Sequence, residues 1–122
     1  MDLRHEFDGD TLAVPLDDAL LPGAEADTDV DVRIVRLLSD THARKLLLDF
    51  TGVRNLRSMG IAALMQVHKA CKEKGVALAV CGLDADVAQV FRVTALTRVF
   101  SVYTTATEAR GAFGRGDDPD ER

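Results

Sequence analysis

The chain has 122 residues, with 47% hydrophobic and 29% charged side chains and a formal net charge of −5. This length suits one domain with a single hydrophobic core, and the composition is that of an ordinary globular protein. The acidic balance argues against nucleic acid as a partner, which would require a clustered excess of Lys and Arg. No apolar run approaches the ~20 residues that span a bilayer, so the sequence predicts no membrane insertion.

The start of the chain, MDLRHEF, lacks the apolar segment of a signal peptide. The two cysteines, Cys71 and Cys81, stand in apolar surroundings and form no CxxC pair. We therefore expect a cytoplasmic protein whose cysteines serve as small buried hydrophobes.

The first predicted elements are two short strands around the turn signal Asp8-Gly9-Asp10. Pro15 indicates a sheet edge or the end of a strand, and residues 17–27 predict a loop. A helix is expected from Thr28, which with Asp31 can cap its start. The positions that recur on one face of this helix are Val30, Ile34, Leu37, Leu38 and Thr41.

The middle of the chain alternates apolar strands with amphipathic helices. Lys45 to Phe50 is typical of a covered central strand, and residues 58–74 form a helix that ends before Gly75. Val76 to Gly82 predicts a second buried strand, and Asp84 is expected to cap a third helix. The predicted inner face of that helix consists of Val87, Val90, Phe91 and Thr94.

The last predicted elements are a short strand in RVFSVY and a helix that a capping box of Thr105 and Glu108 opens. The alternation of strands and helices predicts an α/β fold with a mixed, mostly parallel sheet of about five strands. About four helices should lie mainly on one face of this sheet. We expect one domain over residues 1–113 and a disordered polar tail over residues 114–122.

Two stretches follow a known pattern. In LLDFTGVRNLRSMGIAAL a strand is followed by D-x-[ST]-G-V, a short loop and a small polar residue before a glycine that opens a helix. In DVAQVFRVTALTRVFSVYTTATEA the matching positions are Thr94, Leu96, Val99 and Phe100. Over residues 45–109 the chain resembles the STAS domain of anti-sigma-factor antagonists. The N-terminal part matches more loosely, through Leu16 and Asp17.

The resemblance implies a STAS-like fold and a non-enzymatic protein-binding module that needs no cofactor and no metal. The implied partner is an anti-sigma factor that is also a serine kinase and docks over the loop before the second long helix. Asp17, Asp49 and Thr51 would support that loop. The residues that would contact the partner are Arg54, Asn55, Leu56, Arg57, Ser58, Met59 and Gly60.

Met59 occupies the position at which the family carries a phosphorylated Ser or Thr. A thioether cannot accept a phosphoryl group, so the usual switch, which adds about −1.5 to −2 charge at the contact surface, is missing there. Three interpretations stay open. Ser58 and Met59 form an ordinary helix start, Met59 belongs to a docking surface that phosphate cannot switch off, or phosphorylation moves to Ser58 beside Arg57. We favour the second, because it also fits Arg57 in place of an acidic residue.

Other functions were weighed against this hypothesis. His68 and Cys71 have a spacing that suits two metal ligands, but no further His or Cys cluster accompanies them, and Asp17 with Asp49 is weak support for catalysis. The alternative functions are a STAS subunit of a signalling scaffold or of a lipid-transport ABC complex, or a small-anion sensor that uses Arg54 and Arg57. A homodimer is also left open.

Overall fold

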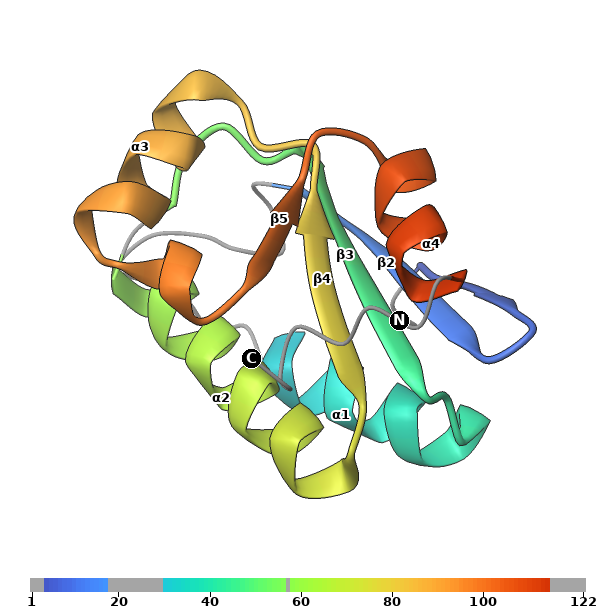
Figure 1. Cartoon of the computed structure of the whole chain (residues 1–122). Coiled ribbons are helices and arrows are strands. Elements are labelled where there is room, and N and C mark those ends of the chain that lie inside the picture. The colour runs from blue at the N-terminus through green and yellow to red at the C-terminus, as the bar shows by residue number, and fades with distance from the viewer. Residues whose placement is uncertain (1–3, 18–29, 57, 115–122) are drawn as a thin grey trace.

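The computed structural model describes residues 4–17, 30–56 and 58–114, and the chain has the predicted α/β architecture (Figure 1). Five strands form a sheet in the order β1-β2-β3-β4-β5, in which β1 is antiparallel to β2 and all other neighbours are parallel. The strands are β1 (Glu6–Asp8), β2 (Thr11–Asp17), β3 (Lys45–Gly52), β4 (Ala77–Cys81) and β5 (Ser101–Tyr103). The helices are α1 (Val30–Thr41), α2 (Ser58–Lys74), α3 (Ala85–Val93) and α4 (Ala106–Gly114).

The predicted hairpin at the start of the chain is confirmed. β1 pairs with the first three residues of β2, and Gly9 makes the turn with a φ of 64° that favours glycine. Pro15 lies in β2 beyond the part that β1 covers, so its missing N–H costs no bond to β1. Asp17, the first residue of the predicted loop over 17–27, still belongs to β2, and Gly114, the first residue of the predicted tail over 114–122, is the last residue of α4. The rest of that loop, the Thr28 cap and residues 115–122 lie outside the described residues.

The sheet is covered on both faces, by three helices on one and by α4 on the other. Because side chains alternate along a strand, Leu46, Leu48 and Phe50 of β3 pack against α1, α2 and α3, whereas Leu47 packs against Ala109 and Phe113 of α4. Figure 1 shows α4 on the opposite side of the sheet from α1 and α2. The prediction of helices mainly on one face is thus confirmed.

Aromatic rings connect the larger part of the core. The rings of Phe50 and Phe91 meet edge to face at 5.7 Å, and Phe91 is 6.0 Å from Phe100. Phe100 in turn contacts the ring of His68 at 5.7 Å. Such pairs stabilise by about 0.5–1.5 kcal/mol beyond the area they bury, so they fix β3, α2, α3 and the segment before β5 against one another.

Two details of the predicted third helix and last strand are wrong. Thr94 does not face the core but is exposed, and its hydroxyl donates to the Val90 carbonyl at 2.6 Å as α3 ends. Ala95 then takes a left-handed φ of 61°, and Leu96–Arg98 form a short 3-10 helix. The last strand therefore begins only at Ser101, three residues after this turn.

Candidate functional site

The candidate site lies at the edge of the sheet where β2, β3 and β4 end. Parallel strands place their carboxyl ends at one edge, and Figure 1 shows that edge at the top, beside the start of α3. The connection between β3 and α2 leaves the sheet here and leads to Ser58, the first residue of α2. This is the segment that the sequence predicts as the contact surface.

Two apolar residues anchor this connection to the core. Val53 is fully buried, and its N–H donates to the carbonyl of Phe50 at 2.9 Å, which closes a turn directly after β3. Leu56 is only 7% exposed and belongs to the same core. Between these anchors, Arg54 and Asn55 are exposed. The connection therefore exposes two polar side chains between two residues that are buried in the core.

Asp49 and Thr51 form a hydrogen-bonded pair at the end of β3. The Asp49 carboxylate accepts from the Thr51 backbone N–H at 2.9 Å and from the Thr51 hydroxyl at 2.6 Å, both through Oδ1. A carboxylate that accepts two such bonds holds the last residues of the strand in one conformation. Asp49 thus satisfies a backbone N–H at the end of β3, just before the connection to α2.

Gly82, directly after β4, makes room for this pair. It has a φ of 74°, and a Cβ built on it would lie 2.6 Å from the Thr51 hydroxyl oxygen and 3.0 Å from Asp49 Oδ1. The first separation is shorter than real Cβ contacts, and the second is tighter than most of them. Gly82 is thus a residue of the candidate site that our sequence reasoning missed, although a glycine between an apolar strand and the helix-capping Asp84 was a visible signal.

Gly52 brings the ends of β2 and β3 together in a similar way. It pairs in register with Asp17, which is exposed. A Cβ on Gly52 would lie 2.9 Å from the carbonyl oxygen of Leu16. The predicted supporting residues Asp17, Asp49 and Thr51 are therefore brought to one edge, Asp17 through its pairing with Gly52.

Cys81 lies below this edge on the face that α4 covers. Burial and, to a smaller extent, the negative charge of Asp49 raise the pKa of its thiol to about 11, and Arg110 acts in the opposite direction. The thiol consequently stays protonated at neutral pH, and a protonated buried thiol is a poor nucleophile. Cys71 is fully buried as well, as expected for cysteines that act as core residues.

The remaining predicted contact residues lie at the start of α2. Gly60 is buried, and Ser58 and Met59 occupy the first turn of the helix. Arg57 lies outside the described residues. In the helix after Gly60, Leu64, Val67 and Cys71 are buried and Ile61 packs against the core, whereas Gln66, Lys69 and Glu73 are exposed.

The residues weighed as metal ligands have other surroundings. His68 packs on the ring of Phe100, and Cys71 belongs to the core. Among the residues that the structure describes, no group of three His, Cys, Asp or Glu side chains is placed to hold a metal ion. Over the same ranges, no helix has the length and apolar character to cross a membrane.

The sequence matches the family model of the STAS domain over residues 9–109, which is most of the chain. The protein belongs to the STAS domain family.

Solved structures with the same fold include an anti-sigma-factor antagonist (STAS) domain protein from Planctomyces limnophilus, with a TM-score of 0.79 and 22% identity over 93% of this chain and 99% of that one. A serine-to-glutamate variant of RsbS from Moorella thermoacetica aligns with a TM-score of 0.78 at 11% identity, over 91% and 96% of the two chains. The Bacillus cell fate determinant SpoIIAA in its phosphorylated form gives 0.65 at 12% identity, over 91% and 98%. At these identities the similarity concerns the fold.

Proposed function

We propose that the protein is a non-enzymatic binding module of bacterial signalling that acts like an anti-sigma-factor antagonist. Its partner is an anti-sigma factor that is also a serine kinase, and a cytoplasmic location stays a prediction of the sequence. The contact surface comprises residues 54–60, that is, the connection between β3 and α2 with the first turn of that helix.

The observation that carries this proposal is the way in which the connection is held. The side chains of Val53 and Leu56 anchor the connection in the core. The Asp49–Thr51 hydrogen bonds hold the end of β3, where the connection begins. A segment that is held in this way, here residues 53–56, loses little conformational entropy when a partner docks. The exposed Arg54 and Asn55 then lie beside the N-terminal end of α2, where the helix dipole favours acidic groups of a partner.

Met59 defines how this module differs from a phosphorylation switch. With no hydroxyl at this position, the partner kinase has no acceptor there, and binding persists in the presence of ATP. Methionine also adapts well to apolar surfaces of a partner. Ser58 is the neighbouring hydroxyl, and its phosphorylation is the competing hypothesis.

The binding test introduces the charge that the missing phosphate would bring. We expect Met59→Glu to weaken binding to serine-kinase anti-sigma factors by at least about tenfold, because a carboxylate would be buried without a partner at the contact. Biolayer interferometry with each purified kinase measures the dissociation constant.

Met65→Glu is the matched control, since Met65 is an exposed methionine of the same helix, six residues beyond Met59 and on another side of it. Equal affinities for wild type and Met59→Glu would contradict the proposed surface. Recovery of an ABC-transporter ATPase in place of an anti-sigma factor, in a pull-down with the full chain, would favour the lipid-transport alternative.

Intact-mass spectrometry after incubation with the kinase and ATP tests the absence of a switch. We expect no added phosphate. A phosphate that peptide mapping places on Ser58, and that Ser58→Ala abolishes, would show that the switch has moved by one residue.

A further inference from the structure

An open groove of about 300 Å³ lies between the outer sides of α1 and α2. Its apolar lining consists of Val32 and Val35 from α1 and Ala70 from α2. Val32 is 51% exposed, and Val35 and Ala70 are partly buried, so the groove offers apolar surface to a molecule that enters it. Figure 1 shows the two helices side by side on one face of the sheet.

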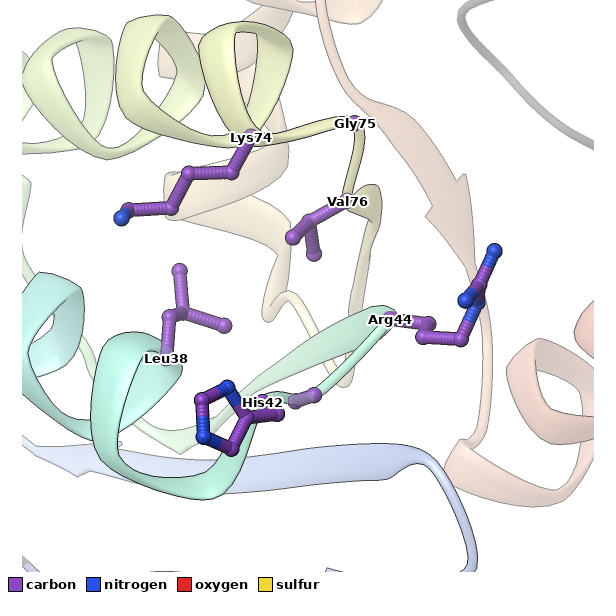
Figure 2. A pocket seen from close by; sticks show the side chains of 7 residues that line it. Leu38, His42, Arg44, Lys74, Gly75 and Val76 are labelled. Atoms are coloured by element: carbon purple, nitrogen blue, oxygen red, sulfur yellow. The ribbon is translucent and has the colours of Figure 1, made fainter.

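A second pocket of about 300 Å³ lies where β3 and β4 begin, and it has an explanation within the fold. Figure 2 shows Leu38 and Val76 between the side chains of Lys74 and His42. Leu38 and Val76 are only 2% and 4% exposed, so they offer no surface to an apolar ligand. The basic side chains are near the C-terminal ends of α1 and α2, where they offset the helix dipoles. The groove is therefore the stronger candidate for binding.

Two side chains of the groove are not explained by the fold. Val32 lies in the first turn of α1, where an exposed β-branched residue weakens the helix slightly and adds nothing to the core. Glu73 lies in the last turn of α2, where the helix dipole disfavours a carboxylate. Lys69 precedes it by four residues, which is the less favourable order for a helical ion pair. Apolar side chains with charges around them are typical of a protein interface.

The proposed contact surface, residues 54–60, is too small by itself for a stable complex. Specific interfaces use about 20–30 residues on each side, so a partner must also cover neighbouring surface. The groove adjoins residues 54–60 through α2, which begins at Ser58 and lines the groove at Ala70. At 1.5 Å per residue these two positions are about 18 Å apart along the helix, a distance that one partner of ordinary size spans.

We propose that the anti-sigma factor extends from residues 54–60 along α2 into this groove. An apolar side chain of the partner packs on Val32, Val35 and Ala70, and a lysine or arginine next to it pairs with the Glu73 carboxylate. Among the lining residues the two carboxylates, of Asp31 and Glu73, outnumber the one cation, so the groove complements a basic segment. This inference rests on the proposed function and adds the chemistry of the partner segment.

Val32→Glu tests the apolar part of the groove in the binding assay with purified serine-kinase anti-sigma factors. We expect the dissociation constant to rise at least about tenfold, because a carboxylate then faces the apolar side chain of the partner. The variant should fold as well as wild type, since Val32 is exposed and glutamate is both a better helix former and favoured in a first turn. Thermal unfolding followed by circular dichroism checks this.

Met65→Glu is the matched control, because Met65 is an exposed apolar residue of α2 that does not line the groove. Its dissociation constant should stay within about twofold of wild type. If Met59→Glu weakens binding and Val32→Glu does not, the groove is not part of the interface and the proposed function stands. If wild type binds no such kinase, the proposed function fails and the groove proposal fails with it.

Glu73→Lys tests the charged part of the groove. We expect the dissociation constant to rise about fivefold at low ionic strength, and by less as salt is added. Asp40→Lys makes the same change of charge at an exposed position of α1 that does not line the groove, and should have a smaller effect. Equal effects of the two variants would show that only the net charge matters and would overturn the pairing with Glu73.

Discussion

Gly82 has a left-handed backbone and faces the side chains of Asp49 and Thr51 across a space that no Cβ fits. Its importance comes from the approach of two strand ends, which are more than thirty residues apart in the sequence. The end of β4 passes very near the end of β3. The Thr51 hydroxyl and the Asp49 carboxylate therefore occupy the space that a side chain at position 82 would need. The candidate surface after β3 therefore depends on a residue of another connection.

We expect Gly82→Ala to lower the free energy of unfolding by about 2–4 kcal/mol. About 1–2 kcal/mol comes from the left-handed backbone, and the remainder from displacement of the Asp49–Thr51 hydrogen bonds. Urea denaturation followed by circular dichroism measures the change.

Gly9→Ala is the control, since Gly9 has a φ of 64° and nothing within 4 Å of its built Cβ. It should lose only the backbone part, about 1–2 kcal/mol. Equal losses of unfolding free energy in the two variants would show that the close contacts of Gly82 do not contribute to stability.

Individual residues differ in how far the sequence alone could predict them. Asp49 and Thr51 follow a recognisable local pattern next to a strand, and their mutual hydrogen bonds span only two positions of the chain. For Gly82 the sequence shows only a glycine after a strand, and its close approach to Asp49 and Thr51 could not be predicted. Those neighbours are distant in sequence, and no local periodicity or spacing encodes such an approach.

The helices show how well local signals predict an element. The capping box before α4 is formed as expected, because Thr105 Oγ1 accepts from the Glu108 N–H at 3.1 Å and Glu108 Oε1 accepts from the Thr105 N–H at 3.3 Å. The N-cap of α3 is also confirmed, since Asp84 accepts from the Val87 N–H at 2.8 Å. The 3-10 helix of Leu96–Arg98 was not predicted, because three residues are too few to display a period.

Asp84→Ala should lower the free energy of unfolding by about 1 kcal/mol, since the first turn of α3 then loses its side-chain acceptor. Thermal unfolding monitored by circular dichroism, with chemical denaturation for the free energy, measures the effect. Asp86→Ala removes an exposed carboxylate from the same first turn without removing the cap, and should cost less than about 0.5 kcal/mol. A loss in Asp86→Ala as large as that in Asp84→Ala would indicate general electrostatics and not capping.

For the molecule as a whole, the order of elements and the two-sided burial of the central strands follow from the sequence. Runs such as Lys45–Phe50 are apolar on both faces, and other elements must pack on both faces of such a strand. The sequence does not reveal which helix covers which face. That choice depends on the path of each crossover, and the small side chains of Ala77, Ala79 and Cys81 indicate only afterwards why α4 can lie so near β4.

The buried thiol of Cys81 predicts a pH dependence of global stability. Its pKa is about 11 in the folded protein against an ordinary value of 9.0, so between these values the unfolded chain binds fewer protons than the folded one. The free energy of unfolding should therefore be unaffected by this group below pH 9 and should fall as the pH rises toward 11, by at most about 3 kcal/mol.

Urea denaturation at several pH values between about 8 and 10.5 tests this dependence in wild type and in Cys81→Ala. The variant lacks the thiol, so it should be less stable at pH 8 but lose less stability on the way to high pH. If the free energy of unfolding fell equally with pH in wild type and in Cys81→Ala, groups other than the Cys81 thiol would cause the destabilisation.

The shape of the sheet has a consequence for these molecules at high concentration. Each of its outer strands, β1 and β5, is three residues long, and β1 carries the carboxylates of Glu6 and Asp8. An approaching copy would find few backbone groups to pair with at either side, and at β1 it would meet negative charge. The short, charged outer strands thus leave the proposed contact surface exposed without favouring polymerisation of the chains into fibrils through their strands.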